Sequence, residues 1–255
     1  MTGGSRQRVS VVLPTYNEAG NIVALIRAIK AAIPSGYDRE ILCVDDNSPD
    51  GTYQLVVDAF AGDPEVVAVL RTSDRGFAKS IRAGIERSTG DKVVVMDTDF
   101  THDPAEIPRL LHVGQIYDLV SGSRFCPGGA MQDTRHYMAS LVYNGVLRLI
   151  LRTQVQDNLG GYFVVDRAAL AGLPFDRIFF GYGEYYFRLL HFLLIRGRRV
   201  VEIPARYMVR TSGTSKSRFM KMMFTYAAAA IRLRADTRSN RSSIRAVDDQ
   251  PSIGR

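Results

Sequence analysis

The chain has 255 residues, enough for one large α/β domain or two small ones, and its composition (46% hydrophobic, 23% charged) is ordinary for a globular protein. Two cysteines, Cys43 and Cys126, are too few for a disulfide framework, which excludes the small disulfide-rich secreted domains. No run of about 18 apolar residues is present, so the sequence predicts no membrane-spanning helix.

The net charge of +7 is concentrated near the C-terminus. Residues 206–245 include ten Lys or Arg residues and one acid, so this segment carries +9 and the remainder of the chain −2. Such a segment can bind anionic lipid head groups or nucleic acid, or form a solvated tail. Residues 1–8 predict a flexible N-terminus, and the polar residues 236–255 predict a disordered tail.

Strand and helix patterns alternate through the first hundred residues. Short apolar runs bounded by turn formers predict strands over 9–13, 40–44, 66–70 and 93–96. Stripes at helical spacing predict helices over 21–33, 52–60 and 77–88. Three β-α units predict a parallel sheet with right-handed crossovers. Their loops should meet at one edge of this sheet and bring together Tyr16, Glu18, Asp46, Arg75, Asp97 and Asp99.

The second half of the chain predicts a less regular continuation. Helices are expected over 106–112, 137–151 and 185–195, and strands over 118–121, 162–165 and 199–203. Neither G-x-G-x-x-G after the first strand nor G-x-x-x-x-G-K-[ST] occurs, which disfavours a dinucleotide-binding Rossmann site and a P-loop.

The segment 92–104 contains the most informative pattern. Four apolar residues run directly into Asp97 and Asp99, so both acids lie at the carboxyl end of a buried strand, where open α/β sheets bind ligands. Residues two apart can point the same way, and two close carboxylates favour a hard divalent cation, Mg²⁺ or Mn²⁺. The alternative is a loop that only caps the next helix, with Asp103 as N-cap and Pro104 as the first helical residue. His102 is expected to be a surface or capping residue rather than one that orients a ligand.

Five motifs occur together in order: Pro-Thr-Tyr-Asn-Glu (14–18), Val-Asp-Asp-Asn-Ser-Pro-Asp-Gly-Thr (44–52), Met-Asp-Thr-Asp (96–99), Gly-Ser-Arg-Phe (122–125) and Gly-Thr-Ser-Lys (213–216). With these motifs the chain resembles the inverting GT-A glycosyltransferases of family 2, most closely the polyprenol-phosphate (dolichol-phosphate) mannose synthases. The resemblance covers residues 9 to about 220. It implies a GT-A nucleotide-binding fold over 9–218, with a mostly parallel central sheet flanked by helices.

The resemblance also implies roles for single residues. Pro14, Tyr16, Glu18 and Asp46 would bind the nucleotide, while Asp97 and Asp99 would bind the metal and through it the diphosphate. The basic and hydroxyl residues would manage phosphate charge: Arg124, Arg135 and Ser215 at the acceptor phosphate, and Arg124, Arg210 and Lys216 with Asp99 as the catalytic set.

The chain departs from the family pattern at several positions. Thr101 replaces the usual Gln or Ser after the second acid, which puts a third protein ligand to the metal in doubt. Gly160-Gly161-Tyr162 replaces Ser-Gly-Phe, and Arg135 is only near the position of a further acceptor arginine. Phe187 and Arg188 occupy positions where many relatives carry a glutamate, and whether Glu184 substitutes is left open.

The implied function is transfer of a hexose, mannose first and glucose second, from GDP-mannose or UDP-glucose to a polyprenyl phosphate, without a nucleic-acid partner. A hydroxyl acceptor on a glycan, lipid or metabolite and a non-catalytic nucleotide-sugar-binding subunit are the alternatives. Residues 219–235 predict an amphipathic basic helix that lies on a membrane surface, or packs on its own domain or a partner subunit. A cytoplasmic, peripheral location on the inner face of the cell membrane follows, with a separate membrane-spanning subunit as a further partner.

Overall fold

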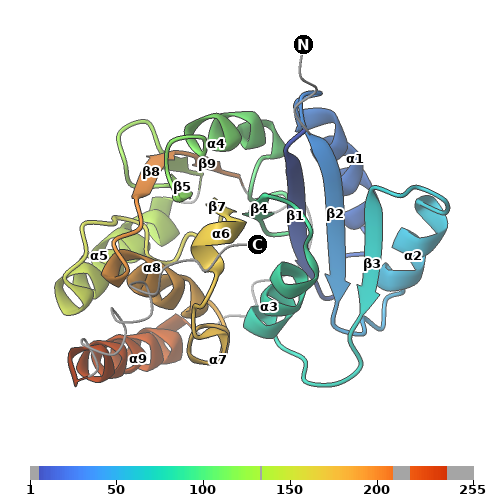
Figure 1. Ribbon diagram of the computed structural model, residues 1–255. Coiled ribbons are helices and arrows are strands. Elements are labelled where there is room, and N and C mark those ends of the chain that lie inside the picture. Colours follow the sequence, from blue (N-terminus) through green and yellow to red (C-terminus); the bar gives the residue numbers. More distant parts are fainter. Residues whose placement is uncertain (1–5, 133, 209–218, 240–255) are drawn as a thin grey trace, which may run out of the picture.

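A seven-stranded sheet forms the centre of the computed structural model, which describes residues 6–132, 134–208 and 219–239 (Figure 1). Across the sheet the strands follow the order β3 (Val66–Leu70), β2 (Asp38–Asp45), β1 (Arg8–Thr15), β4 (Lys92–Val95), β7 (Phe163–Asp166), β5 (Leu119–Ser123) and β8 (Val200–Pro204). Only β7 runs antiparallel to its neighbours, whereas all other pairs in this sheet are parallel. The predicted mostly parallel sheet is therefore confirmed.

Alternate residues of the central strands feed two separate cores. Val11 of β1 packs in the layer of α1 (Ile22–Ala32), α2 (Thr52–Ala59) and α4 (Ile107–Val113). Helix α4 follows a short 3₁₀ turn at Pro104–Glu106. Val12 packs in the opposite layer, which contains α3 (Phe77–Arg87), α5 (Thr134–Leu151), α6 (Arg167–Leu170), α7 (Phe175–Ile178), α8 (Tyr185–Ile195) and α9 (Phe219–Ser239). The strands are thus buried on both faces, as continuous apolar runs predict.

Helix α1 shows how the sequence pattern sets the local structure. Its stripe of Ile22, Leu25, Ile26 and Ile29 is completely buried. The helix ends at Ala32 because Pro34 cannot continue it and restricts Ile33 to an extended conformation. The predicted helix is confirmed to within a residue at each end.

Helix α3 lies directly on β1 and β2 because it contains Gly84. A Cβ atom at this position would lie 2.3 Å from Cγ1 of Val12, so only glycine permits the close approach. The loop before the helix meets the loop that follows β2.

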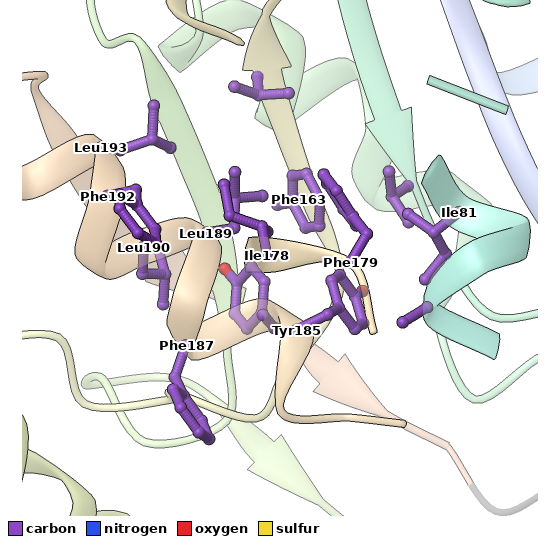
Figure 2. Close-up of a cluster of buried hydrophobic side chains, with 14 of the residues drawn as sticks. Ile81, Phe163, Ile178, Phe179, Tyr185, Phe187, Leu189, Leu190, Phe192 and Leu193 are labelled. Atoms are coloured by element: carbon purple, nitrogen blue, oxygen red, sulfur yellow. The ribbon is translucent and has the colours of Figure 1, made fainter. Parts of the chain in front are cut away.

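A cluster of aromatic and aliphatic side chains packs α7 and α8 against one face of the sheet (Figure 2). Phe163 of β7 stacks on Tyr186 of α8 with ring centroids 5.1 Å apart. Tyr185 stacks on Phe179 just after α7, with centroids 5.9 Å apart. Ile81 brings α3 into the same cluster, so both halves of the domain share one core.

Helices α5 and α9 pack against each other at the margin of the domain (Figure 1). The Tyr143 hydroxyl donates to the carbonyl of Met223 (2.6 Å), and Arg234 donates to the carbonyl of Ile150 (2.6 Å). Helix α9 covers the predicted residues 219–235 and continues to Ser239, the last residue described; residues 240–255 lie outside the described residues. Within the described ranges, no helix is long and apolar enough to span a bilayer.

Candidate active site

The loops that follow β1 and β2 are bound to each other at the carboxyl edge of the sheet. The backbone N–H groups of residues 17–19 donate to side chains of the second loop: Asn17 to Ser48 (2.9 Å), Glu18 to Thr52 (2.9 Å) and Ala19 to Asp50 (3.0 Å). Asp50 also accepts from the Thr52 hydroxyl at 2.6 Å. Because side chains of the second loop satisfy these backbone amides, the two loops are ordered without a ligand.

Asp46 joins this pair of loops to the third one. Its Oδ1 atom pairs with the guanidinium of Arg71, and its Oδ2 atom accepts from the backbone N–H of Gly76 at 2.6 Å. Arg75 donates to the Asp46 carbonyl at 3.4 Å. The predicted meeting of Asp46 and Arg75 is confirmed, although the Asp46 carboxylate is engaged by the protein itself.

The other predicted nucleotide-binding residues lie at the end of β1. Pro14 is buried in the strand opposite Val44. The ring of Tyr16 is exposed, and the Glu18 carboxylate accepts from the side-chain amide of Asn21 at 2.9 Å. Tyr16 thus places a partly exposed aromatic ring at this edge of the sheet.

Asp97 and Asp99 follow β4 at the same edge. The Asp97 side chain is 37% exposed, whereas Asp99 is nearly buried. Oδ1 of Asp99 accepts both the backbone N–H (3.1 Å) and the hydroxyl (2.6 Å) of Thr101. The Thr101 hydroxyl is therefore turned toward Asp99.

The chain reverses after Asp97 and Asp99, called here the acid pair, and brings His102 back to them. Phe100 adopts a positive φ of 61°, a conformation uncommon for a bulky residue. His102 is buried and its Nδ1 accepts the backbone N–H of Asp97 at 2.9 Å, so the expected surface or capping role is wrong. Burial lowers the pKa of His102 to about 3, and the ring is neutral. Asp103 does cap the following turn, accepting the N–H of Ala105 at 2.9 Å.

Arg124 is held in a buried ion pair with Asp157. Its Nε and Nη2 atoms donate to the two oxygens of Asp157 at 2.8 and 2.7 Å, and its backbone N–H donates at 3.1 Å. Asp157 is completely buried, and Glu202 accepts its backbone N–H at 2.8 Å. The Asp157 charge keeps the guanidinium ionised by raising the pKa of Arg124, against the opposing effect of burial. Asp157 and Glu202 were not among the site residues predicted from the sequence.

Tyr207 connects this ion pair to the acid pair. It belongs to β9 (Arg206–Tyr207), which pairs with β6 (Ala130–Met131) in a short ribbon. The Arg124 guanidinium lies 4.9 Å from the centre of the Tyr207 ring, and the His102 ring packs edge-on against the same ring at 4.7 Å. Arg124 and the acid pair are therefore parts of one cluster.

Glu184 does not have the environment of a general base. It is buried, its carboxylate accepts the backbone N–H of Tyr182 at 2.9 Å, and it lies 3.7 Å from the guanidinium of Arg188. Arg188 in turn lies over the Phe180 ring at 3.6 Å. This arrangement anchors the loop before α8.

The remaining predicted phosphate-binding residues cannot be placed. Arg135 belongs to α5, but its side chain lies outside the described residues, as do Arg210, Ser215 and Lys216. The described chain before this gap ends at Met208, whose backbone N–H donates to the carbonyl of Thr101 at 3.0 Å. The described chain before the gap therefore ends close to Thr101 and the acid pair.

The donor set at the acid pair suits a hard cation that shares its coordination with a ligand. Among the described residues, no three His, Cys, Asp or Glu side chains come together to hold a metal ion. Mg²⁺ commonly binds one or two carboxylates together with substrate phosphates, and two adjacent aspartates fit that pattern.

Solved structures share this fold. Glucosyl-3-phosphoglycerate synthase from Mycobacterium tuberculosis, crystallised with Mn²⁺, uridine diphosphate and phosphoglyceric acid, superposes with a TM-score of 0.68 at 20% identity, covering 89% of this chain and 78% of that one. A mycobacterial protein structure gives 0.71 at 20% identity, with coverage of 90% and 75%. The fold is that of the GT-A glycosyltransferases.

The sequence comparisons define the family. The family model for glycosyl transferase family 2 matches residues 10–173. The undecaprenyl-phosphate mannosyltransferase of Micrococcus luteus is 34% identical over 82% of this chain and 87% of its own length. The polyprenol monophosphomannose synthase of Mycolicibacterium smegmatis is 33% identical, with coverage of 90% and 89%. The dolichol-phosphate mannosyltransferase of Pyrococcus furiosus is 31% identical over 89% of this chain, which spans only 63% of that relative. The chain belongs to glycosyl transferase family 2.

Proposed function

We propose that the protein transfers a hexose, with inversion, from a nucleotide sugar to a polyprenyl phosphate. Mannose from GDP-mannose is the first choice and glucose from UDP-glucose the second. The acid pair at the carboxyl edge of a GT-A sheet carries this proposal, because it lies beside ordered loops that can receive a nucleotide. The names of the relatives, an undecaprenyl-phosphate mannosyltransferase and a polyprenol monophosphomannose synthase, favour mannose and a lipid phosphate.

In the donor site, Tyr16 would stack on the base, with Pro14, Glu18 and Asp46 around it. Asp97 and Asp99 would hold Mg²⁺ or Mn²⁺ against the diphosphate. When bound, the cation supplies charge stabilisation to the departing nucleoside diphosphate. Arg210 and Lys216 are assigned to the same developing charge.

The acceptor chemistry follows from the charge of a phosphate monoester. A phosphate oxygen forms the new bond to the anomeric carbon as the bond to the diphosphate breaks on the opposite face. The nucleophile is already anionic near neutral pH, so the step needs positioning rather than a strong base. This agrees with the engagement of Glu184 by Tyr182 and Arg188. Arg124, Arg135 and Ser215 are assigned to the acceptor phosphate.

A membrane surface is the proposed location of the lipid acceptor. Helices α5 and α9 both expose large apolar side chains: Met138, Leu141, Val142, Val146, Leu149, Phe224 and Ile231. Arg148 and Arg232 are exposed on the same two helices. Apolar and basic residues together suit the surface of an anionic leaflet, here the inner face of the cell membrane. A separate membrane-spanning subunit is the alternative occupant of this face.

The test is a transfer assay with radiolabelled GDP-mannose and UDP-glucose, each offered a short polyprenyl phosphate and a set of hydroxyl acceptors. We expect mannosyl transfer to the phosphate that stops in EDTA and returns with Mg²⁺ or Mn²⁺. Transfer only to a hydroxyl would support the first alternative. Calorimetric binding of donor without transfer or hydrolysis would support a non-catalytic subunit.

A further inference from the structure

We propose that His102 is a positioning residue that sets the orientation of Asp97 for metal and diphosphate binding. This inference rests on the proposed function, because it assumes that Asp97 contributes to a metal site. Its basis is the geometry of the ring at the end of β4.

The ring of His102 takes the place of a strand partner. The last sheet bond near this point runs from the N–H of Met96 to the carbonyl of Val12, 3.4 Å away. The next N–H, that of Asp97, donates instead to Nδ1 of His102 at 2.9 Å. The peptide that carries the first acid is therefore held by a side chain rather than by the sheet.

Two tyrosines hold the ring in place. Tyr162 stacks on it with an interplanar angle of 10° and a centroid distance of 4.8 Å, and Tyr207 packs against it at 81° and 4.7 Å. The Tyr162 hydroxyl donates to the carbonyl of Asp103 at 2.8 Å, which fixes the chain just after the histidine. Because the ring is clamped, the position of Nδ1 is defined before any ligand arrives.

The second ring nitrogen faces the carboxylate of the same aspartate. Since Nδ1 accepts a hydrogen bond, the neutral ring carries its proton on Nε2. Nε2 is buried close to the backbone of Gly160, and Oδ2 of Asp97 lies 3.9 Å away from it. One ring therefore contacts the Asp97 peptide through one edge atom and faces its carboxylate with the other. This is an orienting role for the site rather than general packing.

The test compares two substitutions that separate the acceptor from the ring. His102→Phe keeps a flat ring between the tyrosines but leaves the Asp97 N–H without an acceptor. His102→Asn supplies a side-chain oxygen near the position of Nδ1 but no ring. We expect Mn²⁺ affinity, measured by calorimetry in the presence of GDP, to fall about tenfold in the Phe variant and to recover largely in the Asn variant. Binding of GDP in EDTA should be unchanged in both.

The outcomes of these measurements distinguish a failure of the positioning role from a failure of the proposed function. Wild-type Mn²⁺ affinity in His102→Phe, or an equal loss in both variants, would overturn the positioning role. If the Phe variant does not fold, judged by its melting temperature, the comparison of His102→Ala with His102→Asn replaces it. A wild-type protein whose GDP binding gains nothing from Mn²⁺ would instead overturn the metal part of the proposed function.

Discussion

Replacement of Asp157 by Asn tests the buried ion pair between Asp157 and Arg124. Asp157 is completely buried and Arg124 is 8% exposed, so the substitution leaves a guanidinium without a counter-charge where water cannot replace it. Breaking a buried pair in this way costs about 3–5 kcal/mol. For a domain of this size that corresponds to a melting temperature lower by about 6–20 °C. Urea unfolding followed by circular dichroism, together with a thermal scan, measures both values.

The double variant Arg124→Met with Asp157→Asn is the matched control. Methionine at position 124 removes the unpaired charge, and asparagine at position 157 can still accept the backbone N–H of residue 124. The double variant should be more stable than Asp157→Asn alone by about 2 kcal/mol, because removing both charges costs less than removing one. A loss below about 1 kcal/mol in the single variant, or no recovery in the double one, would refute this account. If Arg124 contacts the acceptor phosphate as proposed, the folded double variant should transfer sugar at least about tenfold more slowly.

Three further predictions address the acid pair, the helix interface and the exposed apolar face. Asp97→Ala and Asp99→Ala should each abolish transfer without a large change in melting temperature; normal wild-type turnover in a chelator would contradict the metal site. Burial and Arg234 lower the pKa of His191 to about 4, and the ring contacts the Thr237 hydroxyl at 3.0 Å. Between pH 6.5 and 4, His191 is protonated in the unfolded chain but not in the folded one. The free energy of unfolding should therefore decrease by up to about 1.4 kcal/mol for each unit by which the pH is lowered. In His191→Gln, the free energy of unfolding measured by urea titration should depend less steeply on pH over this range. An unchanged pH dependence would contradict the assignment. Leu149→Glu with Phe224→Glu (79% and 73% exposed) should weaken binding to anionic vesicles in a sedimentation assay, whereas Ile116→Glu (60% exposed) should not; equal losses would argue against this face.

Most helices and strands could be predicted from the sequence because the burial of each one follows from the apolar pattern of its own residues. The four apolar residues before Asp97 and the stripe of α1 are local signals of a buried strand and an amphipathic helix. The direction of β7 had no such signal, since Phe163–Asp166 reads the same in a parallel or antiparallel pair. Handedness rules constrain parallel crossovers only, so the reversal could not be inferred.

The acid pair could likewise be predicted because its position follows from one strand end. Its surroundings depend on contacts between residues distant in the chain. Asp157 lies 33 residues from Arg124, and Tyr207 meets His102 from 105 positions away. The only local signals were an acid before the Gly160-Gly161 turn and a histidine after the acid pair, and neither reveals its partner.

The reversed strand β7 has a mechanical consequence. Because it begins at the edge where β4 ends, the ladder that pairs Val95 with Phe163 fixes the spacing between Asp97 and the glycine turn that leads into Tyr162. Asp97 and the Gly160-Gly161 turn are thus attached to paired neighbouring strands, and neither can slide along the sheet alone. Lengthening the loop before Gly160 would change the residues around this turn while leaving Asp97 in register with the sheet.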